Sequence, residues 1–197
     1  MNSSASILAT KAGLRAAALA RRDALAPDLR AAAAEAIAAR PLPVAVSRGT
    51  VVSGFMPIRS EINSLPLLRR FAEAGASLAL PAITGREKPL RFRAWSFGEP
   101  LARGQWGIRE PAPDAPEIQP DIVLVPLAAF DRHGYRIGYG AGYYDKSLMA
   151  LRALKAVVAI GLGYAAQEIP EVPVLPHDAR LDLVLTEREV IDLRSVS

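Results

Sequence analysis

The sequence contains no cysteine. The chain can therefore form no disulfide bond and no thiolate metal site, which fits a reducing, cytoplasmic setting. It also lacks any apolar run approaching the roughly 20 residues that a membrane-spanning helix requires. The first residues, MNSSASILATKAGLR, lack the basic-then-apolar order of a signal peptide. We therefore expect a soluble, cytoplasmic protein without a membrane partner.

Aromatic residues are scarce, at 6% of the chain, and positive charge is unevenly distributed. Residues 1–110 carry 16 Lys and Arg against 8 Asp and Glu, whereas residues 111–197 carry 8 against 12. A basic half suggests a nucleic acid, a nucleotide or a polyanionic metabolite as partner, although charge alone favours solvated arginines on helix faces. Few aromatics are interleaved with the basic residues and no nucleic-acid motif is present, so a nucleic-acid-binding module is the weaker alternative.

The 197 residues, about half of them hydrophobic, suit one domain with a sizeable core. The Ala-, Leu- and Arg-rich residues 6–39 predict two helices separated at Pro27, and further helices are expected at 65–74 and 143–154. Apolar runs predict the strands. These strands cover residues 50–56, 77–83, 90–95, 121–130, 155–162 and 181–186. Residues 98–120, rich in Gly, Pro and charge, are expected to form a long surface connection.

Strands and helices alternate along the chain, which favours an α/β fold. We expect a single domain with a mostly parallel sheet sandwiched by helices, spanning residues 1–197. The helical segment 1–40 is expected to pack on it. The nearly continuous apolar run at 121–130 is typical of a strand buried on both faces.

The stretch FDRHGYRIGYGAGYYDKSL, residues 130–148, follows that strand and leads into a predicted helix. Glycines at the carboxyl end of a strand let backbone N–H groups approach a phosphate, and the helix start adds unpaired donors. Arg136 and Lys146 can add charge. The spacing GYGAG at 138–142 nevertheless matches neither the dinucleotide fingerprint nor a P-loop. A phosphate cradle and a tight turn with positive φ both stay open.

Two acids follow the ends of neighbouring predicted strands. Asp145 lies in the first turn of the predicted helix, where a carboxylate can cap the helix or bind Mg²⁺ beside phosphates. Asp178 precedes the last predicted strand. Each is commonly a solvated residue or a cap, but two such acids are well placed to share a metal. Tyr143 and Tyr144 at the helix start are either core residues or a pocket wall for a flat ring.

Basic residues also line the first predicted helix. Lys11 and Arg15 are four residues apart and so share one face, and Arg21 and Arg22 follow about two turns later. Such residues are most often exposed to solvent. A nucleotide phosphate is the more specific alternative.

These motifs together resemble the 5-formyltetrahydrofolate cyclo-ligase family, also called the 5,10-methenyltetrahydrofolate synthetases. The resemblance covers nearly the whole chain. It rests on K-x-x-x-R at Lys11 and Arg15, on a strand followed by P-x-x-x-E at Pro57 and Glu61, and on two longer segments. These are VPLAAFDRHGYRIGYGAGYYDK at 125–146, the most specific, and PHDARLDLVLTE at 176–187.

The resemblance implies an ATP- and Mg²⁺-dependent reaction on 5-formyltetrahydrofolate, free or polyglutamylated. In that family ATP phosphorylates the formyl oxygen, N10 attacks the activated carbon, and phosphate leaves to give 5,10-methenyltetrahydrofolate and ADP. The protein mainly has to align two ligands and neutralise phosphate charge. The family also implies an α/β sandwich, and we expect a monomer.

The resemblance also implies roles for individual residues. Lys11, Arg136 and Tyr143 are expected to be catalytic, with Tyr143 at the junction of the two ligands. Asp145 and Asp178 are expected to bind the metal. The folate is expected to contact Met56, Glu61 and residues 139–143, with Trp106 as a weaker candidate. The residues expected to bind ATP are Lys11, Arg15, Arg136, Ile137, Gly138, Tyr139, Gly140, Ala141, Gly142, Tyr143 and Tyr144.

Two positions depart from the family. Some members have Arg at the position of Tyr139, where it can meet phosphate, and Arg is common at the position of Lys146. Tyrosine cannot supply that charge, and lysine lacks the bidentate fork of arginine, so Arg136 or Lys146 is expected to compensate. A nucleotide-binding fold that has lost catalysis is a third hypothesis. The presence of Lys11, Glu61 and Asp145 argues against it.

Overall fold

The N-terminal part of the chain forms two helices in the computed structural model, which describes residues 4–194. Helix α1 covers Ser4–Asp23 and helix α2 covers Pro27–Ala38. Pro27 begins α2, where its missing N–H removes no helical hydrogen bond, so the predicted break is confirmed. Although α1 is 20 residues long, neither it nor any other helix within residues 4–194 is apolar enough to cross a membrane.

A seven-stranded sheet forms the centre of the fold. Its strands are β1 (Val51–Ser53), β2 (Ser77–Ala82), β3 (Arg91–Ala94), β6 (Ile122–Pro126), β9 (Val158–Leu162), β10 (Leu183–Leu185) and β11 (Val190–Asp192). They lie in the order β11-β10-β9-β6-β1-β2-β3. The five inner strands run parallel, and the two edge strands are antiparallel to their neighbours. The predicted mostly parallel α/β sheet is thus confirmed.

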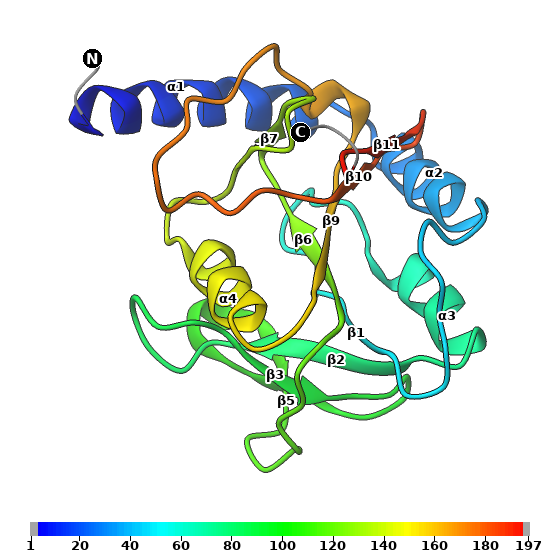
Figure 1. The fold of residues 1–197 in the computed structure, drawn as a ribbon. Coiled ribbons are helices and arrows are strands. Elements are labelled where there is room, and N and C mark those ends of the chain that lie inside the picture. Colours follow the sequence, from blue (N-terminus) through cyan, green and yellow to red (C-terminus); the bar gives the residue numbers. More distant parts are fainter. Residues whose placement is uncertain (1–3, 195–197) are drawn as a thin grey trace.

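Helices cover both faces of this sheet (Figure 1). On one face, α2 and α3 (Leu65–Glu73) pack on a core that includes Leu78 and Leu80 of β2. On the other, α4 (Tyr143–Arg152) packs on a core that includes Ala79, because successive side chains of a strand point to opposite faces. Full burial of a side chain such as Leu80 contributes about 1.5–3 kcal/mol. The four helices and the sheet form one α/β domain within the described residues.

Three stretches differ from the sequence-based expectation. Residues 121–130 are not one strand: after β6 the chain turns into β7 (Ala129–Phe130), which pairs with β8 (Arg136–Ile137) in a separate two-stranded sheet. The expected surface connection at 98–120 contains a hairpin of β4 (Leu101–Arg103) and β5 (Arg109–Pro111). The antiparallel edge strand β11 was not predicted. The strands β4, β5, β7, β8 and β11 have only two or three residues each, which gives a periodic pattern little to identify.

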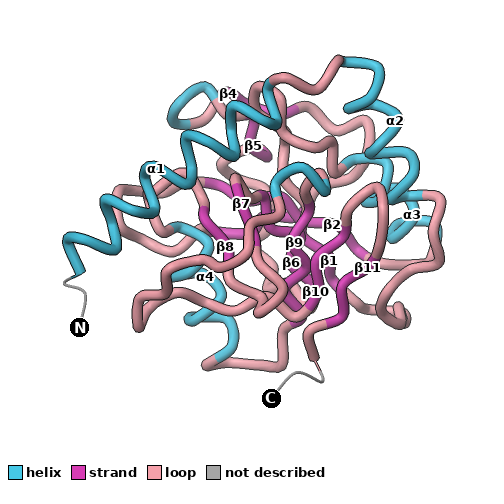
Figure 2. Tube along the Cα trace, turned by 90° about the horizontal axis from the view of Figure 1, so that it is seen from above, coloured by secondary structure: helices cyan, strands magenta, loops and turns pink. Residues whose placement is uncertain are grey.

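Helix α1 packs against β7 of the small sheet and against the 3-10 helix Ala165–Gln167. It lies beside β7 in the view from above (Figure 2). Leu14 and Ala18 contribute to a third apolar cluster with Ala129 and Ile137. Since β8 leads directly into residues 138–142, which we call the glycine loop, this packing brings the basic face of α1 against that loop.

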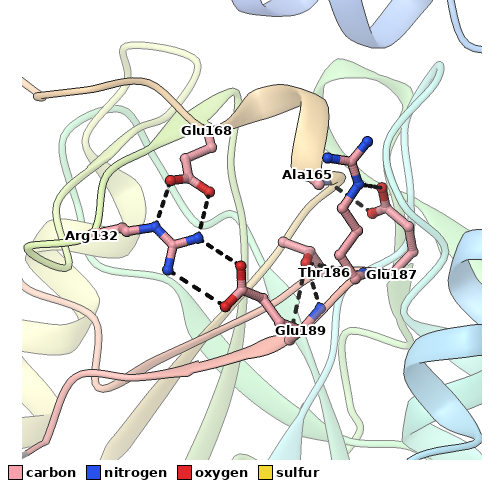
Figure 3. A network of polar contacts seen from close by, with 7 residues as sticks. Arg132, Ala165, Glu168, Thr186, Glu187 and Glu189 are labelled. Carbon is pink, nitrogen blue, oxygen red and sulfur yellow. Dashed lines mark hydrogen bonds and ion pairs between the residues drawn. The ribbon is translucent and has the colours of Figure 1, made fainter.

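A network of ion pairs joins three surface segments beside the β10–β11 turn (Figure 3). Arg132, in the β7–β8 turn, pairs with Glu168 at 2.7 Å and with Glu189 at 2.6 Å. Glu187 accepts a hydrogen bond from the backbone N–H of Ala165 at 2.9 Å. The guanidinium of Arg132 thus links the small sheet to an edge of the large one.

We expect Arg132→Met to destabilise the fold at pH 7 but far less at pH 3. The hydrogen bond from Arg132 holds the pKa of Glu189 below its ordinary value of 4.5. A depressed carboxyl pKa gives stability that is present above about pH 4.5 and lost as the pH falls through the folded-state value. The effect is modest because the pair is exposed.

Urea unfolding of wild type and variant at both pH values measures this effect. Arg91→Met, which removes the single exposed pair of Arg91 with Glu117, is the matched control and should change stability less. An equal difference between wild type and Arg132→Met at pH 7 and pH 3 would contradict the prediction.

Candidate active site

A cavity of about 710 Å³ lies at the carboxyl ends of the parallel strands. Its wall includes Met56 after β1, Pro126 at the end of β6 and Ile83 after β2. This is where open α/β sheets usually bind ligands. All fifteen predicted site residues line it. They are Lys11, Arg15, Met56, Glu61, Arg136, Ile137, Gly138, Tyr139, Gly140, Ala141, Gly142, Tyr143, Tyr144, Asp145 and Asp178.

The glycine loop forms one wall of this cavity. Gly140 has φ +98° and Gly142, which caps α4, has φ +68°, values that L side chains rarely adopt. The Arg15 Nε–H donates to the Gly138 carbonyl at 2.5 Å, so α1 holds the loop from outside. The loop is therefore both a glycine turn and a stretch of bare backbone facing the cavity. Ile137, expected to bind ATP, lines the cavity and pairs with Ala129 in the small sheet.

Arg136 is buried and fixes the metal-site candidate Asp145. Its guanidinium donates to Asp145 Oδ1 at 2.8 Å and to the Ala179 carbonyl at 2.6 Å. The backbone N–H of Ala179 donates to the same Oδ1 at 3.0 Å. Burial lowers the pKa of Arg136, and the Asp145 carboxylate opposes that shift. Asp145 is therefore an ion-pair partner inside the wall rather than a helix cap.

Lys11 and Asp178 form a second ion pair in the same wall. Lys11 is only 6% exposed, so the expectation that basic residues of this helix face solvent is wrong for it. Asp178 Oδ2 also accepts the backbone N–H of Leu175 at 2.7 Å. Among the described residues, neither Asp178 Oδ1 nor Asp145 Oδ2 has a hydrogen-bond partner. Each carboxylate is thus held in place by hydrogen bonds to one of its oxygens, and its other oxygen remains available to a ligand.

The loop after β1 contributes Met56 and Glu61, two of the residues expected to contact folate, to the cavity wall. Glu61 Oε2 accepts the backbone N–H of Ile58 at 2.9 Å. Burial raises the pKa of Glu61, while Ile58, Tyr139 and Arg22 oppose that shift. Trp106 also lines the cavity, is 69% exposed, and adopts φ +62° in the turn between β4 and β5.

Two residues near the cavity were not predicted to belong to the site. Glu110 of β5 is a buried carboxylate in the cavity wall, and its Oε1 accepts the Ile83 N–H at 3.1 Å. Gly104 makes room for it, because a Cβ there would lie 2.2 Å from Glu110 Cδ. Arg22 is 1% exposed, although its sequence position suggested a solvated residue. Both depend on contacts between distant segments, for which the sequence gives no local signal.

Lys146, expected to help compensate for Tyr139, is not among the residues that line the cavity. It lies in the first turn of α4 near Gly142, where a Cβ would be 4.0 Å from the lysine Cε. The Tyr139 hydroxyl instead accepts a hydrogen bond from Arg22 Nη1 at 2.7 Å. The positive charge beside Tyr139 therefore comes from α1.

The model of the 5-formyltetrahydrofolate cyclo-ligase family matches residues 7–187. The chain is 34% identical to the Mycolicibacterium smegmatis 5-formyltetrahydrofolate cyclo-ligase over 194 residues, covering 94% of this chain and 98% of the relative. It is 28% identical to the Escherichia coli 5-formyltetrahydrofolate cyclo-ligase over 178 residues, covering 86% and 96%. The NMR structure of Aquifex aeolicus 5,10-methenyltetrahydrofolate synthetase matches with a TM-score of 0.77 and 28% identity, covering 95% and 94%. The chain belongs to the 5-formyltetrahydrofolate cyclo-ligase family.

Proposed function

We propose that the cavity beside the glycine loop holds ATP, Mg²⁺ and 5-formyltetrahydrofolate together. As a family member, the chain is an ATP-using ligase of folate one-carbon metabolism that converts 5-formyltetrahydrofolate to 5,10-methenyltetrahydrofolate. The observation that supports the assignment of this cavity is the meeting of all fifteen predicted residues in its wall. They come from α1, the loop after β1, β8, the glycine loop, α4 and the segment before β10.

The ATP phosphates are assigned to the glycine loop and the start of α4. Backbone N–H groups at a glycine loop and at a helix N-terminus together favour an anion. Lys11 and Arg15 lie on the α1 side of the same wall. An ammonium group has three donors, and Asp178 is the one partner of Lys11 in the described residues, so donors are available for phosphate oxygens.

Asp145 and Asp178 fit a Mg²⁺ ion that also binds phosphate. Mg²⁺ is usually held by one or two carboxylates plus substrate phosphates, and each acid keeps one oxygen available. No group of three or more His, Cys, Asp or Glu side chains suited to a metal occurs within residues 4–194, which matches such an incomplete protein site. When bound, the ion would neutralise phosphate charge. Arg136 and the Ala179 N–H keep Asp145 in place for it.

The folate is assigned to the side of the cavity formed by Met56, Glu61 and Trp106. A carboxylate accepts hydrogen bonds from the N–H donors of a pterin edge, and the apolar side chains cover flat ring surface. Glu61 is well suited to this role because the Ile58 N–H fixes one of its oxygens. Tyr143, the first residue of α4 after the glycine loop, lines the same cavity and is assigned to the junction of the two ligands.

In the proposed reaction, the γ-phosphoryl group of ATP passes to the formyl oxygen. N10 then bonds to the formyl carbon and loses its proton, and the C–O bond to phosphate breaks, releasing phosphate beside ADP. Lys11 stabilises charge on the transferred group, Arg136 orients Asp145, and Tyr143 aligns the reacting ends. Such a reaction depends mainly on positioning and on electrostatic stabilisation.

The proposal is tested by mixing the purified protein with 5-formyltetrahydrofolate, ATP and Mg²⁺ and following the near-ultraviolet absorbance of the methenyl product. Absorbance should rise only when all three components are present. A protein that binds both ligands without product would have a degenerate site. Failure to bind either ligand would exclude the assignment of this cavity.

A further inference from the structure

Tyr139 of the glycine loop lies near two charged residues of other segments, Arg22 of α1 and Glu61 of the loop after β1. Its hydroxyl oxygen accepts the hydrogen bond from Arg22 Nη1 at 2.7 Å, and the guanidinium lies 5.9 Å from the centre of its ring. The Glu61 carboxyl group and this hydroxyl also affect each other's pKa: Tyr139 lowers the pKa of Glu61, and Glu61 raises that of Tyr139. A guanidinium only donates, so the phenol must accept from Arg22, and its own proton remains available as a donor.

Arg22 also contacts the loop after β1, which contains Glu61, through Ser60. Its Nε–H donates to Ser60 Oγ at 2.9 Å, and Ser60 is the residue before Glu61. The Ser60 hydroxyl in turn donates to Asp23, the neighbour of Arg22 on α1. Arg22 is therefore tied to the loop after β1 both through Ser60 and through Tyr139.

The pKa shifts of Arg22 and Tyr139 are consistent with their hydrogen bond to each other. Although burial lowers the pKa of Arg22, the hydrogen bond and charge interaction with Tyr139 and the nearby acids raise it overall. Burial raises the pKa of Tyr139, so the phenol keeps its proton at neutral pH. Arg22 itself is not among the residues that line the cavity. It can thus act on a bound ligand only through Tyr139 and the Glu61 loop.

We propose that Arg22 and Tyr139 are positioning residues that hold the Glu61 carboxylate toward the folate and fix the folate side of the cavity against the glycine loop. This inference rests on the proposed function only in assigning Glu61 to the folate. In this role Tyr139 positions other side chains, whereas the arginine found at this position in some family members can contact phosphate directly. Through Tyr139, the buried guanidinium of Arg22 acts on Glu61, the acid assigned to the substrate.

Tyr139→Phe tests the bridge with little risk to folding, because the Tyr139 side chain is 40% exposed and the ring is retained. We expect the KM for 5-formyltetrahydrofolate to rise about tenfold, as for loss of a hydrogen bond to a charged group. We expect kcat and the KM for ATP to change by less than about threefold, because the backbone of the glycine loop is unchanged. Arg22→Lys, which lacks the guanidinium fork, should change the same constants in the same direction.

A double-mutant cycle separates this role from a general structural one. Tyr139→Phe should add less than about twofold to the folate KM of Glu61→Gln, because the two residues act as one unit. Tyr135→Phe, which removes a phenol outside the cavity wall, is the matched control and should leave all constants unchanged.

The outcomes distinguish failure of the inference from failure of the proposed function. Additive effects of Tyr139→Phe and Glu61→Gln, or an equal loss in the constants for folate and ATP, would overturn the bridge while leaving the reaction intact. A Glu61→Gln variant with unchanged folate KM would also overturn it, since the bridge would then hold no folate ligand. A wild-type protein without turnover would instead refute the proposed function.

Discussion

Replacing Asp145 by asparagine is expected to lower kcat by at least about 100-fold while the chain still folds. Asparagine keeps the shape of the side chain and an oxygen that can accept from Arg136 and from the Ala179 N–H. It removes the negative charge that a metal ligand needs. Steady-state kinetics at increasing Mg²⁺ concentration, together with a thermal melt of the variant, measure both expectations.

Alanine would be a poorer choice at this position. Arg136 is buried, and removal of its carboxylate partner would leave an uncompensated charge, which typically costs about 3–5 kcal/mol of stability. The interaction of Asp178 with Arg136 offsets only part of that loss. A fall in activity of Asp145→Ala could then reflect unfolding rather than loss of the metal ligand.

Asp182→Asn is the matched control. Asp182 Oδ2 accepts from Arg152 Nη2 and from the Ala159 N–H, both at 2.7 Å, which is the arrangement of Asp145 repeated outside the cavity wall. This variant should retain its kcat and lose less stability, because the Arg152–Asp182 pair is more exposed to solvent than the Arg136–Asp145 pair. A wild-type kcat in Asp145→Asn at ordinary Mg²⁺ concentration would remove Asp145 from the metal role.

Lys11→Met is expected to raise the KM for ATP by about 10- to 100-fold, because it removes a charged donor from the proposed phosphate site. It should also lower the free energy of unfolding, since Asp178 would lose its ion pair and keep only the Leu175 N–H as a hydrogen-bond donor. Methionine preserves the length and apolar stem of the side chain. Kinetics with ATP varied at saturating 5-formyltetrahydrofolate measure the first effect, and urea unfolding measures the second.

Lys155→Met supplies the comparison for this variant. Lys155 pairs with Asp121 at 2.5 Å just before β6, at the opposite end of that strand from the cavity. The control should change stability without changing the KM for ATP. If Lys11→Met altered stability alone, Lys11 would be a structural partner of Asp178 and would have no role at the phosphates.

The main elements of the fold could be predicted because their patterns are long enough to be specific. Proline at 27 separated two helices, and apolar runs of five or six residues marked β2, β6 and β9. The two- and three-residue strands β7, β8 and β11 carried no such signal. Their pairing depends on neighbours supplied by the rest of the fold, as is common for short strands.

The membership of the site could likewise be predicted, but its internal contacts could not. The motifs around Lys11, Glu61 and residues 136–145 named the residues that meet in one cavity. They did not show that Arg136 holds Asp145 or that Lys11 holds Asp178. Such pairs join positions far apart in the chain, so residue spacing carries no information about them.

The α/β class, the family and the set of residues around the glycine loop can be read from the chain alone, because they depend on local patterns and on recognisable motifs. Which charges are buried, and with which partners, depends on how distant segments pack together. Arg22 illustrates the difference: helical spacing favoured an exposed arginine, yet it is 1% exposed and bound to Ser60 and Tyr139. A charge can be buried only where other segments supply acceptors, and that arrangement arises when the chain packs.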